Sequence, residues 1–479
     1  MFRKALLVTL GALSSYAVGV SISAQLTSSL QWEDGVIKDR PNHDDIVSGQ
    51  VPLADVAMMG ERLFSAKFNS VDGAGRPLAT GDSKPTYRIA DHGKSFLRTS
   101  GPDSNSCAGC HNEPFIGGSG EFAVNVFVGA QFADPPTTSI DFRDTNERNT
   151  ISIAGAAAME MLAREMTTDL LAIRQEATAE AIRIGRRITV PLQTKDVSFG
   201  TLTVLPDGTY DASLIEGIDE DLILKPFGFK GVVISLREFA INALNHHFGI
   251  QAIERFGWER TGVRDFDGDG IENEFSTGQV TALTVFQAVL PIPSRQETTQ
   301  RTNGEELFRT IGCADCHKPS LPLEATEFSE PNPFNRPGNL STEETRSIRI
   351  PIVAGPRGAG VERTAGGALT IHAYTDLKRH RICDAEDPFF CNEKKRQDRV
   401  PTDQFLTPKL WDLATSAPYG HRGDCGTLSE VILHHSAEGK RSKEKFKLLT
   451  DQDKRALIQF LLSLGQTTYQ SPFLNRRTQ

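Results

Sequence analysis

The pentapeptide Cys-x-x-Cys-His occurs twice in this chain of 479 residues, at positions 107–111 and 313–317. In each copy the two thiols can add across the vinyl groups of a haem, and the adjacent histidine can ligate its iron. The alternative is a pair of redox or zinc-binding Cys-x-x-Cys motifs, but this leaves both histidines unexplained, and a zinc ribbon would bring its pairs closer together. The sequence therefore predicts two covalent c-type haems, here called haem one and haem two, held by Cys107, Cys110 and His111 and by Cys313, Cys316 and His317.

The first 24 residues have the pattern of a secretory signal peptide. Arg3 and Lys4 precede an apolar stretch at 5–20, and small residues lead up to Ala24. Glycines and serines interrupt the apolar stretch, which favours a cleaved signal over the alternative of an uncleaved membrane anchor. Export agrees with the haem motifs, since bacteria attach c-type haem on the far side of the inner membrane. We therefore predict a periplasmic protein.

The chain is acidic, with a formal net charge of −9 at pH 7 that becomes more negative when the two basic residues of the signal are removed. A protein of this charge is not expected to bind nucleic acid. The charge is compatible with docking of a small redox protein that donates or accepts electrons, although charge alone does not identify such a partner. A homodimer is a further arrangement that the sequence leaves open.

Three of the seven cysteines lie outside the haem motifs. Cys383 and Cys391 bracket a short insertion, and a disulfide between them is expected in an oxidising compartment. Cys425 is then either a buried thiol or the true partner of one of the other two.

Periodicity and turn signals predict the organisation of the mature chain. Helices are expected at about 151–180, from Ser235 to Gly249, at 277–290 and at about 451–464, and an alternating segment at 187–210 indicates a β-hairpin. The predicted units are a signal at 1–24, an N-terminal domain at 25–290 with helical and hairpin insertions, a proline-rich linker at 291–302 and a C-terminal domain at 303–479.

A haem iron has a second axial position, whose ligand decides between electron transfer and chemistry at the metal. The capping box at 427–430 predicts the start of a helix. On this helix His435 shares an apolar face with Leu428 and Ile432, whereas His434 points to the opposite side. His435 is therefore the candidate second ligand of haem two, and the alternative is a core histidine bonded to the backbone.

Haem one lacks a nearby second ligand, because no histidine or methionine lies between His111 and Met159. The helix that begins after Ser235 carries His247 on its apolar face, which makes His247 a candidate ligand. The alternative is that this apolar face simply packs in the protein core, as such faces usually do. Haem one is thus five-coordinate or ligated from a distant element, either the His247 helix or the helix with Met159, Met161 and Met166.

An acidic turn is similar to the opening of a calcium-binding loop. Asp265, Asp267 and Asp269 occupy positions one, three and five, and a glycine occupies position six. Position twelve requires a bidentate glutamate but is a serine, and Glu274 falls two residues early. The alternatives are weak calcium binding by these acidic residues and a glycine-rich turn that holds no metal.

With its two haem motifs, Arg-Asn-Thr at 148–150 and Ala-Pro-Tyr-Gly-His-Arg-Gly at 417–423, the chain resembles bacterial di-haem cytochrome c peroxidases. It is most similar to the di-haem oxidoreductase branch of that superfamily, with which it shares Phe-Gly-Phe-Lys-Gly at 227–231, the Asp-Gly loop at 265–274 and the segment 377–380. The resemblance spans nearly the whole mature chain. It implies two cytochrome c-like haem domains packed together, and the predicted fold is mainly α with long loops and a small β-hairpin.

The resemblance also implies roles for individual residues. In the peroxidases a methionine on the helix after the Ala-Pro-Tyr run ligates the C-terminal haem, and the same interval from His421 leads here to His435. Two histidine ligands would then replace a His/Met pair and lower the potential of haem two. The calcium ion that this family holds between its haems would be bound by Asn149, Ser416 and the carbonyl of Pro418.

The distal catalytic glutamine and glutamate of the family have only approximate counterparts, Gln175 and Glu176. The tryptophan that relays electrons between the peroxidase haems is absent from the matching stretch at 163–166. Three functions therefore stay open. The first is a peroxidase in which haem one meets hydrogen peroxide and haem two relays electrons. The others are a non-catalytic electron-transfer cytochrome and an enzyme that oxidises a protein or another organic substrate.

Overall fold

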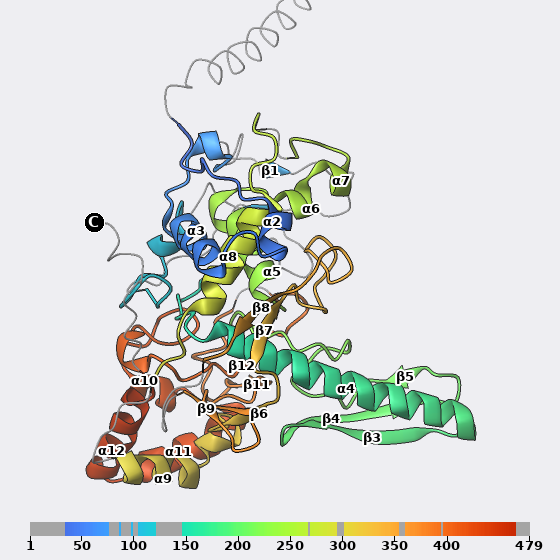
Figure 1. The fold of residues 1–479 in the computed structure, drawn as a ribbon. Coiled ribbons are helices and arrows are strands. Elements are labelled where there is room, and N and C mark those ends of the chain that lie inside the picture. Colours follow the sequence, from blue (N-terminus) through green and yellow to red (C-terminus); the bar gives the residue numbers. More distant parts are fainter. Residues whose placement is uncertain are drawn as a thin grey trace, which may run out of the picture.

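The fold is described from a computed structural model, in which helices and short antiparallel sheets alternate along the chain (Figure 1). The described residues are 34–75, 86–87, 97–98, 104–120, 146–266, 269–294, 301–353, 360–393 and 396–465. The predicted signal peptide and the centre of the predicted linker lie outside these ranges. Among the described residues, no helix is both long enough and apolar enough to cross a membrane.

A group of helices packs beside the first haem motif. Helix α3 (Leu53–Ser65) runs along α8 (Thr277–Val289), and Gly60 permits the contact, because a Cβ there would lie 2.0 Å from the Ala282 carbonyl oxygen. Helix α5 (Leu236–Ala243) follows the expected N-cap Ser235 and continues as a π-helix (Leu244–Phe248) up to Gly249, whose φ of 81° is a left-handed C-cap. Shorter elements here are α2 (His43–Val47), η1 (Ser70–Asp72), η3 (Cys107–Gly109), α6 (Ile253–Phe256), α7 (Trp258–Thr261), β1 (Thr86–Tyr87) and β2 (Leu97–Arg98).

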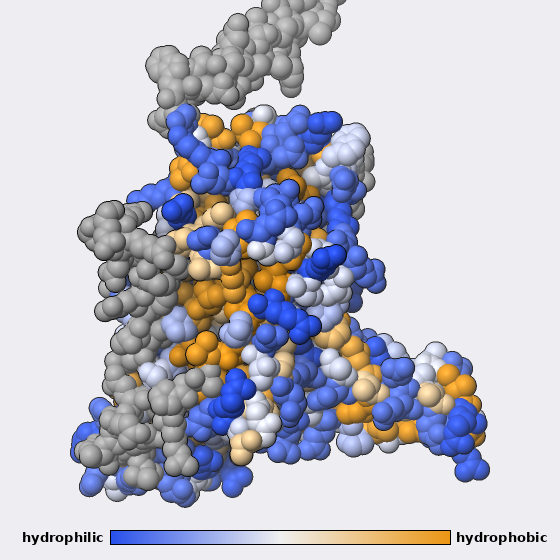
Figure 2. Space-filling view, in the orientation of Figure 1, coloured by the Kyte–Doolittle hydropathy of each residue, from blue (hydrophilic) through white to orange (hydrophobic). Residues whose placement is uncertain are grey.

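Helix α4 (Ala156–Ile184) leaves the body of the molecule as an arm (Figure 1). A hairpin of β3 (Ile188–Thr194) and β4 (Val197–Val204) lies along it, and β5 (Tyr210–Asp211) adds a third strand. The predicted hairpin is confirmed, but its tight turn is Lys195-Asp196, both with positive φ, and the turn at 206–208 instead joins β4 to β5. Exposed apolar side chains gather on the outer part of the arm (Figure 2): Ile182, Ile184, Leu205 and Leu214.

The second haem motif lies among the C-terminal helices. Helix α9 (Arg301–Ile311) packs against α12 (Asp451–Leu462), and their buried cluster includes Phe308 and Phe460. Thr427 forms the predicted capping box, although α10 (Leu428–Leu433) is only 6 residues long. The region also contains α11 (Lys440–Leu448), η6 (Cys313–Asp315), η7 (Leu413–Thr415) and η8 (Ala437–Gly439).

Short antiparallel sheets fill the space between these helical groups. They pair β6 (Leu321–Leu323) and β9 (Val361–Arg363) with β10 (Leu369–Ile371), β7 (Glu327–Glu330) with β8 (Ile348–Pro351), and β11 (Arg379–Arg381) with β12 (Gln404–Leu406). The expectation of a mainly α fold with one small hairpin is corrected: the described chain is mixed. Strands of three or four residues offer too few alternating positions to be recognised in a sequence.

One apolar core extends across the predicted linker, with members from Ile46 to Trp411. Buried ion pairs join the same two regions. Arg237 of α5 is completely buried and pairs with Glu254 at 2.8 Å and with Glu330 of β7. The domain boundaries stay a prediction, and the two regions share extensive packing.

Candidate haem and metal sites

His111 has the surroundings of a proximal haem ligand. Its Nδ1–H donates to the Gly118 carbonyl oxygen at 3.2 Å, which leaves Nε2 for an iron atom. Burial lowers the pKa of His111 to about 4, so the ring is in the neutral form that ligates a metal. Cys107 and Cys110 form no disulfide, and burial raises the pKa of the Cys107 thiol to about 12. The donor set fits a covalently attached haem one.

A hollow that is open to solvent at its mouth lies beside His111. Gln287 of α8 and Lys409, which follows β12, are among the few polar groups in its wall. Lys409 donates to the Ala154 carbonyl oxygen, and burial lowers the pKa of its ammonium group to about 8. The apolar part of the wall comes from both regions of the chain and includes Ile151, Ile153, Met159, Phe227, Phe229, Leu236, Phe239, Leu377 and Leu406. An apolar hollow with a few polar groups suits a haem and a small ligand.

His247 lies on one of the distant elements that the sequence singled out for haem one, the π-helix after α5. Its charge is close enough to His111 to contribute to the lowered pKa of that histidine. The Ser104 amide, three residues before the first haem cysteine, donates to the His247 carbonyl oxygen at 3.5 Å. The π-helix therefore contacts the segment just before the first haem motif. Ligation of haem one by His247 stays a prediction, and Met159, in the wall of the hollow, is the alternative.

His317 has equivalent surroundings at the second motif. Its Nδ1–H donates to the Tyr374 carbonyl oxygen at 3.0 Å, which again leaves Nε2 for an iron atom. Burial lowers the pKa of His317 to about 4, with a further contribution from His435. Cys313 and Cys316 form no disulfide, and burial raises the pKa of the Cys313 thiol to about 12. The residues fit haem two.

His435 lies just beyond the end of α10, so the helix that was expected to carry it stops two residues short. Its Nδ1–H donates to the Val431 carbonyl oxygen at 2.7 Å, which directs Nε2 away from that carbonyl. His434 instead stacks on Phe389, with ring centroids 3.7 Å apart and planes 8° apart. The two histidines thus differ in their partners, although both rings contact Phe390. The role of His435 as an iron ligand stays a prediction.

A cluster that the sequence did not indicate lies against Cys316. His380 Nε2 is 2.8 Å from Asp376 and its Nδ1 is 2.7 Å from Glu438, while the Cys316 sulfur is 3.8 Å from the same Nδ1. Burial alone would lower the pKa of His380, but the hydrogen bonds to Asp376, Cys316 and Glu438 raise it to about 12. Cys316, Asp376 and His380 form a group with metal-binding chemistry, yet a thioether to haem two would consume the cysteine.

The residues proposed for calcium come together only in part. Asn149 Nδ2 donates to the Pro418 carbonyl oxygen at 2.6 Å, and its buried Oδ1 has no hydrogen-bond partner. Rotation of the amide by half a turn would point Oδ1 toward the Pro418 oxygen, a pair of oxygens that calcium favours. The Ser416 hydroxyl is already engaged in another contact, because it donates to the Asp412 carbonyl oxygen at 2.6 Å. The calcium site stays a prediction.

The acidic loop has the contacts of a turn held by its own side chains. Asp265 accepts from the amides of Asp269 at 3.2 Å and Gly270 at 2.9 Å. Glu274 is buried and accepts from the Gln251 amide at 2.7 Å, away from this turn. Asp267 lies outside the described residues. Calcium binding by this loop stays a prediction, beside the alternative of a glycine-rich turn without metal.

Gln175 and Glu176 are exposed on the arm and are not at the hollow. Helix α4 contributes Ala156 and Met159 to the hollow, and with a rise of about 1.5 Å per residue Gln175 lies roughly 24 Å further along the helix. The hollow gives no support to the catalytic assignment of Gln175 and Glu176, which stays a prediction, because α4 continues without a break into the arm. The amide side chain that does line the hollow is Gln287, which no motif marked.

No protein-family model matches the chain. It is 26% identical over 213 residues to the cytochrome-c peroxidase IdrP2 of Denitromonas iodatirespirans, which covers 43% of this chain and 52% of the relative. It is 30% identical over 93 residues to the cytochrome-c peroxidase IdrP1 of the same organism, which covers 18% of this chain and 24% of the relative. The matches thus span about half of the first relative and a quarter of the second.

Solved structures give weaker similarity. A Kuenenia stuttgartiensis hydrazine synthase has a TM-score of 0.35 and 13% identity, over 91% of this chain and 97% of that chain. A MauG-like protein associated with microbial copper homeostasis has a TM-score of 0.34 and 14% identity, over 87% and 91%. TM-scores of this size do not establish a shared fold. By sequence, the chain is a distant relative of cytochrome-c peroxidases over part of its length.

Proposed function

We propose that the protein is an exported di-haem c-type oxidoreductase of the peroxidase kind, with haem one as the reaction site and haem two as the electron relay. The observation that carries the proposal is the pairing of two half-buried, neutral histidines, His111 and His317, with a second histidine near each. The hollow beside His111 supports haem one as the site that meets an oxidant. Hydrogen peroxide is the proposed substrate, and a small redox protein is the proposed electron donor.

A c-type haem supplies an iron that exchanges electrons and can bind a peroxide. The chain's own residues would orient this group and control access to it. The Gly118 and Tyr374 carbonyls fix the tautomer of the two proximal histidines. Lys409 supplies a positive charge in the wall of the hollow, which can pair with a haem propionate. Gln287 and Thr407 supply polar groups that can hydrogen-bond a small oxidant.

The approach of His247 to His111 favours a second candidate, a non-catalytic electron-transfer cytochrome in which both irons have two histidine ligands. In the enzyme, His247 would have to leave haem one before peroxide could reach it. The two candidates therefore differ in whether haem one opens when haem two is reduced.

Electronic and EPR spectra of the holoprotein distinguish these candidates, recorded in the fully ferric and half-reduced states with and without calcium. A high-spin signal that reacts rapidly with peroxide supports the enzyme. Two haems that stay low-spin and inert to peroxide in both states support electron transfer. If peroxide reacts but a reduced small redox protein is not consumed, an organic or protein substrate becomes the better account.

The His247→Ala variant tests the assignment at haem one directly. It should convert haem one to a high-spin form in the ferric state and make it reactive toward peroxide. His246→Ala is the matched control, since it removes a neighbouring imidazole of the same π-helix. A change in the control alone would transfer the ligand role to His246, and no change in either would exclude this helix.

A further inference from the structure

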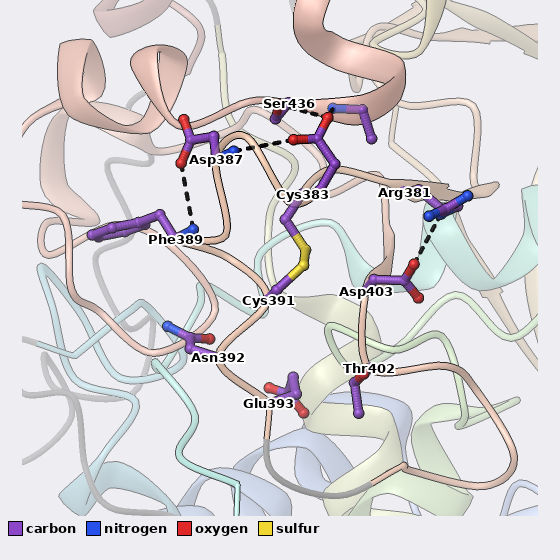
Figure 3. Close-up of a disulfide and its surroundings, with 12 residues drawn as sticks. Arg381, Cys383, Asp387, Phe389, Cys391, Asn392, Glu393, Thr402, Asp403 and Ser436 are labelled. Atoms are coloured by element: carbon purple, nitrogen blue, oxygen red, sulfur yellow. Dashed lines mark hydrogen bonds and ion pairs between the residues drawn. A yellow bond between two sulfur atoms is a disulfide. The ribbon is translucent and has the colours of Figure 1, made fainter.

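The strongest further feature is the loop between Cys383 and Cys391, which packs around the residues that follow α10 (Figure 3). The disulfide that the sequence predicted is present, with Cα atoms 5.6 Å apart, and Cys425 is a buried thiol in the same apolar cluster. We infer that this disulfide-closed loop is a positioning element that holds His435 at haem two. The inference rests on the proposed function, in which His435 ligates that haem.

The loop binds the backbone directly after His435. Asp384 Oδ2 accepts from the Ser436 hydroxyl at 2.9 Å and from the Ala437 amide at 2.9 Å. The Ser436 amide donates to the Ile382 carbonyl oxygen at 2.9 Å, one residue before the disulfide. These three hydrogen bonds fix the two residues after His435 to both sides of Cys383. Hydrogen bonds from the Asp387 and Ala437 amides and from the Ser436 hydroxyl lower the pKa of the Asp384 carboxyl to about 2, so it is ionised at neutral pH.

Aromatic residues of the loop contact the histidines themselves. Phe389 stacks on His434 at 3.7 Å, and Phe390 meets His435 edge-on, with ring centroids 6.1 Å apart and planes at 88°. Phe390 is completely buried, so it cannot move without opening the cluster that contains the disulfide. The side chain before His435, the side chain of His435 and the backbone after it are therefore all in contact with one loop.

His435 needs such support because its own helix cannot supply it. Helix α10 has 6 residues, which is too short to be stable by itself, and His435 lies beyond its last residue. The loop from 383 to 391 contains no helix or strand, so its shape also depends on outside constraints. A disulfide across 8 residues removes much of the freedom of the loop. The cross-link therefore keeps Asp384 and Phe390 in the positions that restrict His435.

The inference is tested in the full-length holoprotein with the double variant Cys383→Ser/Cys391→Ser and with Asp384→Ala, which keeps the disulfide. Both should increase the fraction of time that His435 spends away from the iron. The measured quantities are the high-spin signal of haem two and the rate of cyanide binding to it. We expect cyanide to bind about tenfold faster in both variants, because the backbone after His435 loses either the hydrogen bonds of Asp384 or the cross-link that keeps Asp384 in place.

Two further variants make the outcome decisive. His435→Ala is the reference for complete loss of the ligand, and added imidazole should restore its low-spin spectrum. Glu386→Ala changes the same loop at an exposed side chain that pairs with Lys440, and it should leave spectrum and cyanide binding unchanged. If His435→Ala becomes high-spin while Asp384→Ala and the double serine variant behave as the parent protein does, the loop has no positioning role and the inference is overturned. If His435→Ala itself changes nothing, the ligand assignment in the proposed function is wrong.

Discussion

The side chain of Lys230 should make the stability of this protein depend on pH near neutrality. It is completely buried, although its ammonium group donates to the carbonyl oxygens of Pro401 at 2.7 Å and Thr402 at 3.2 Å and lies 3.9 Å above the Phe405 ring. The pKa of Lys230 is lowered from 10.5 to about 7, mainly by burial; the charge of Glu393 opposes this shift and that of Arg148 adds to it. Folding therefore favours the neutral amine.

The magnitude follows from the two pKa values. Between pH 7 and 10.5 the unfolded chain binds a proton on Lys230 that the folded chain does not bind, so the free energy of unfolding rises with pH. The slope approaches about 1.4 kcal/mol per pH unit, which amounts to about 2 kcal/mol between pH 7.5 and 9.0. Below pH 7 both states are protonated, and this contribution no longer changes. Lys230→Met retains an apolar stem and removes the titrating group.

Urea unfolding of the holoprotein at pH 7.5 and 9.0 measures the effect. The free energy is taken from the transition that exposes residue 230, and it is compared between the parent protein, Lys230→Met and a control variant. The control is Lys447→Met, which removes an exposed amine paired with Glu444. The parent and the control should gain about 2 kcal/mol more than Lys230→Met over this interval. Equal gains in all three proteins would show that Lys230 is protonated throughout, and the reasoning from its burial would be refuted.

Three further outcomes are expected. Cys107→Ala should leave haem one attached by a single thioether or absent while the second motif stays filled, as measured by mass spectrometry of the secreted protein; two fully linked haems would contradict the attachment sites. Asn149→Ala should reduce the calcium content of the purified protein by one ion and alter the haem spectra on chelation, and an unchanged content would exclude this site. His435→Ala should produce a new high-spin component in EPR while His434→Ala, which removes the ring stacked on Phe389, should not; the reverse pattern would exchange their roles.

Local signals in the sequence located the elements that carry the candidate sites, because caps and turns depend on neighbours along the chain. Ser235 and Gly249 bound the helical segment with His247, and Thr427 starts the helix before His435. Cys383 and Cys391 could be paired because they are close in sequence, although the choice against Cys425 required the fold.

Contacts between distant segments could not be predicted in this way. Gln287 and Lys409 reach the hollow from opposite sides of the predicted linker, and neither belongs to a motif. The distance of Gln175 from the hollow could not be predicted for a related reason, since nothing in its neighbours shows that α4 leaves the body of the molecule as an arm. The imidazole of His380, held between two carboxylates, likewise depends on Glu438 from another segment.

The mixed origin of the hollow has a consequence for the maturation of the chain. Residues 406–409 form one part of its wall and lie far behind the first haem motif in sequence, so in an exported chain they would cross the membrane after it. A haem joined early to Cys107 and Cys110 would until then occupy a pocket with one wall missing. A chain that lacks β12 and the residues after it would expose Phe227 and Phe229 to water beside the haem. Exposed apolar surface of this kind lets unfinished chains associate. Prompt packing of residues 406–409 against the first motif would thus limit such association.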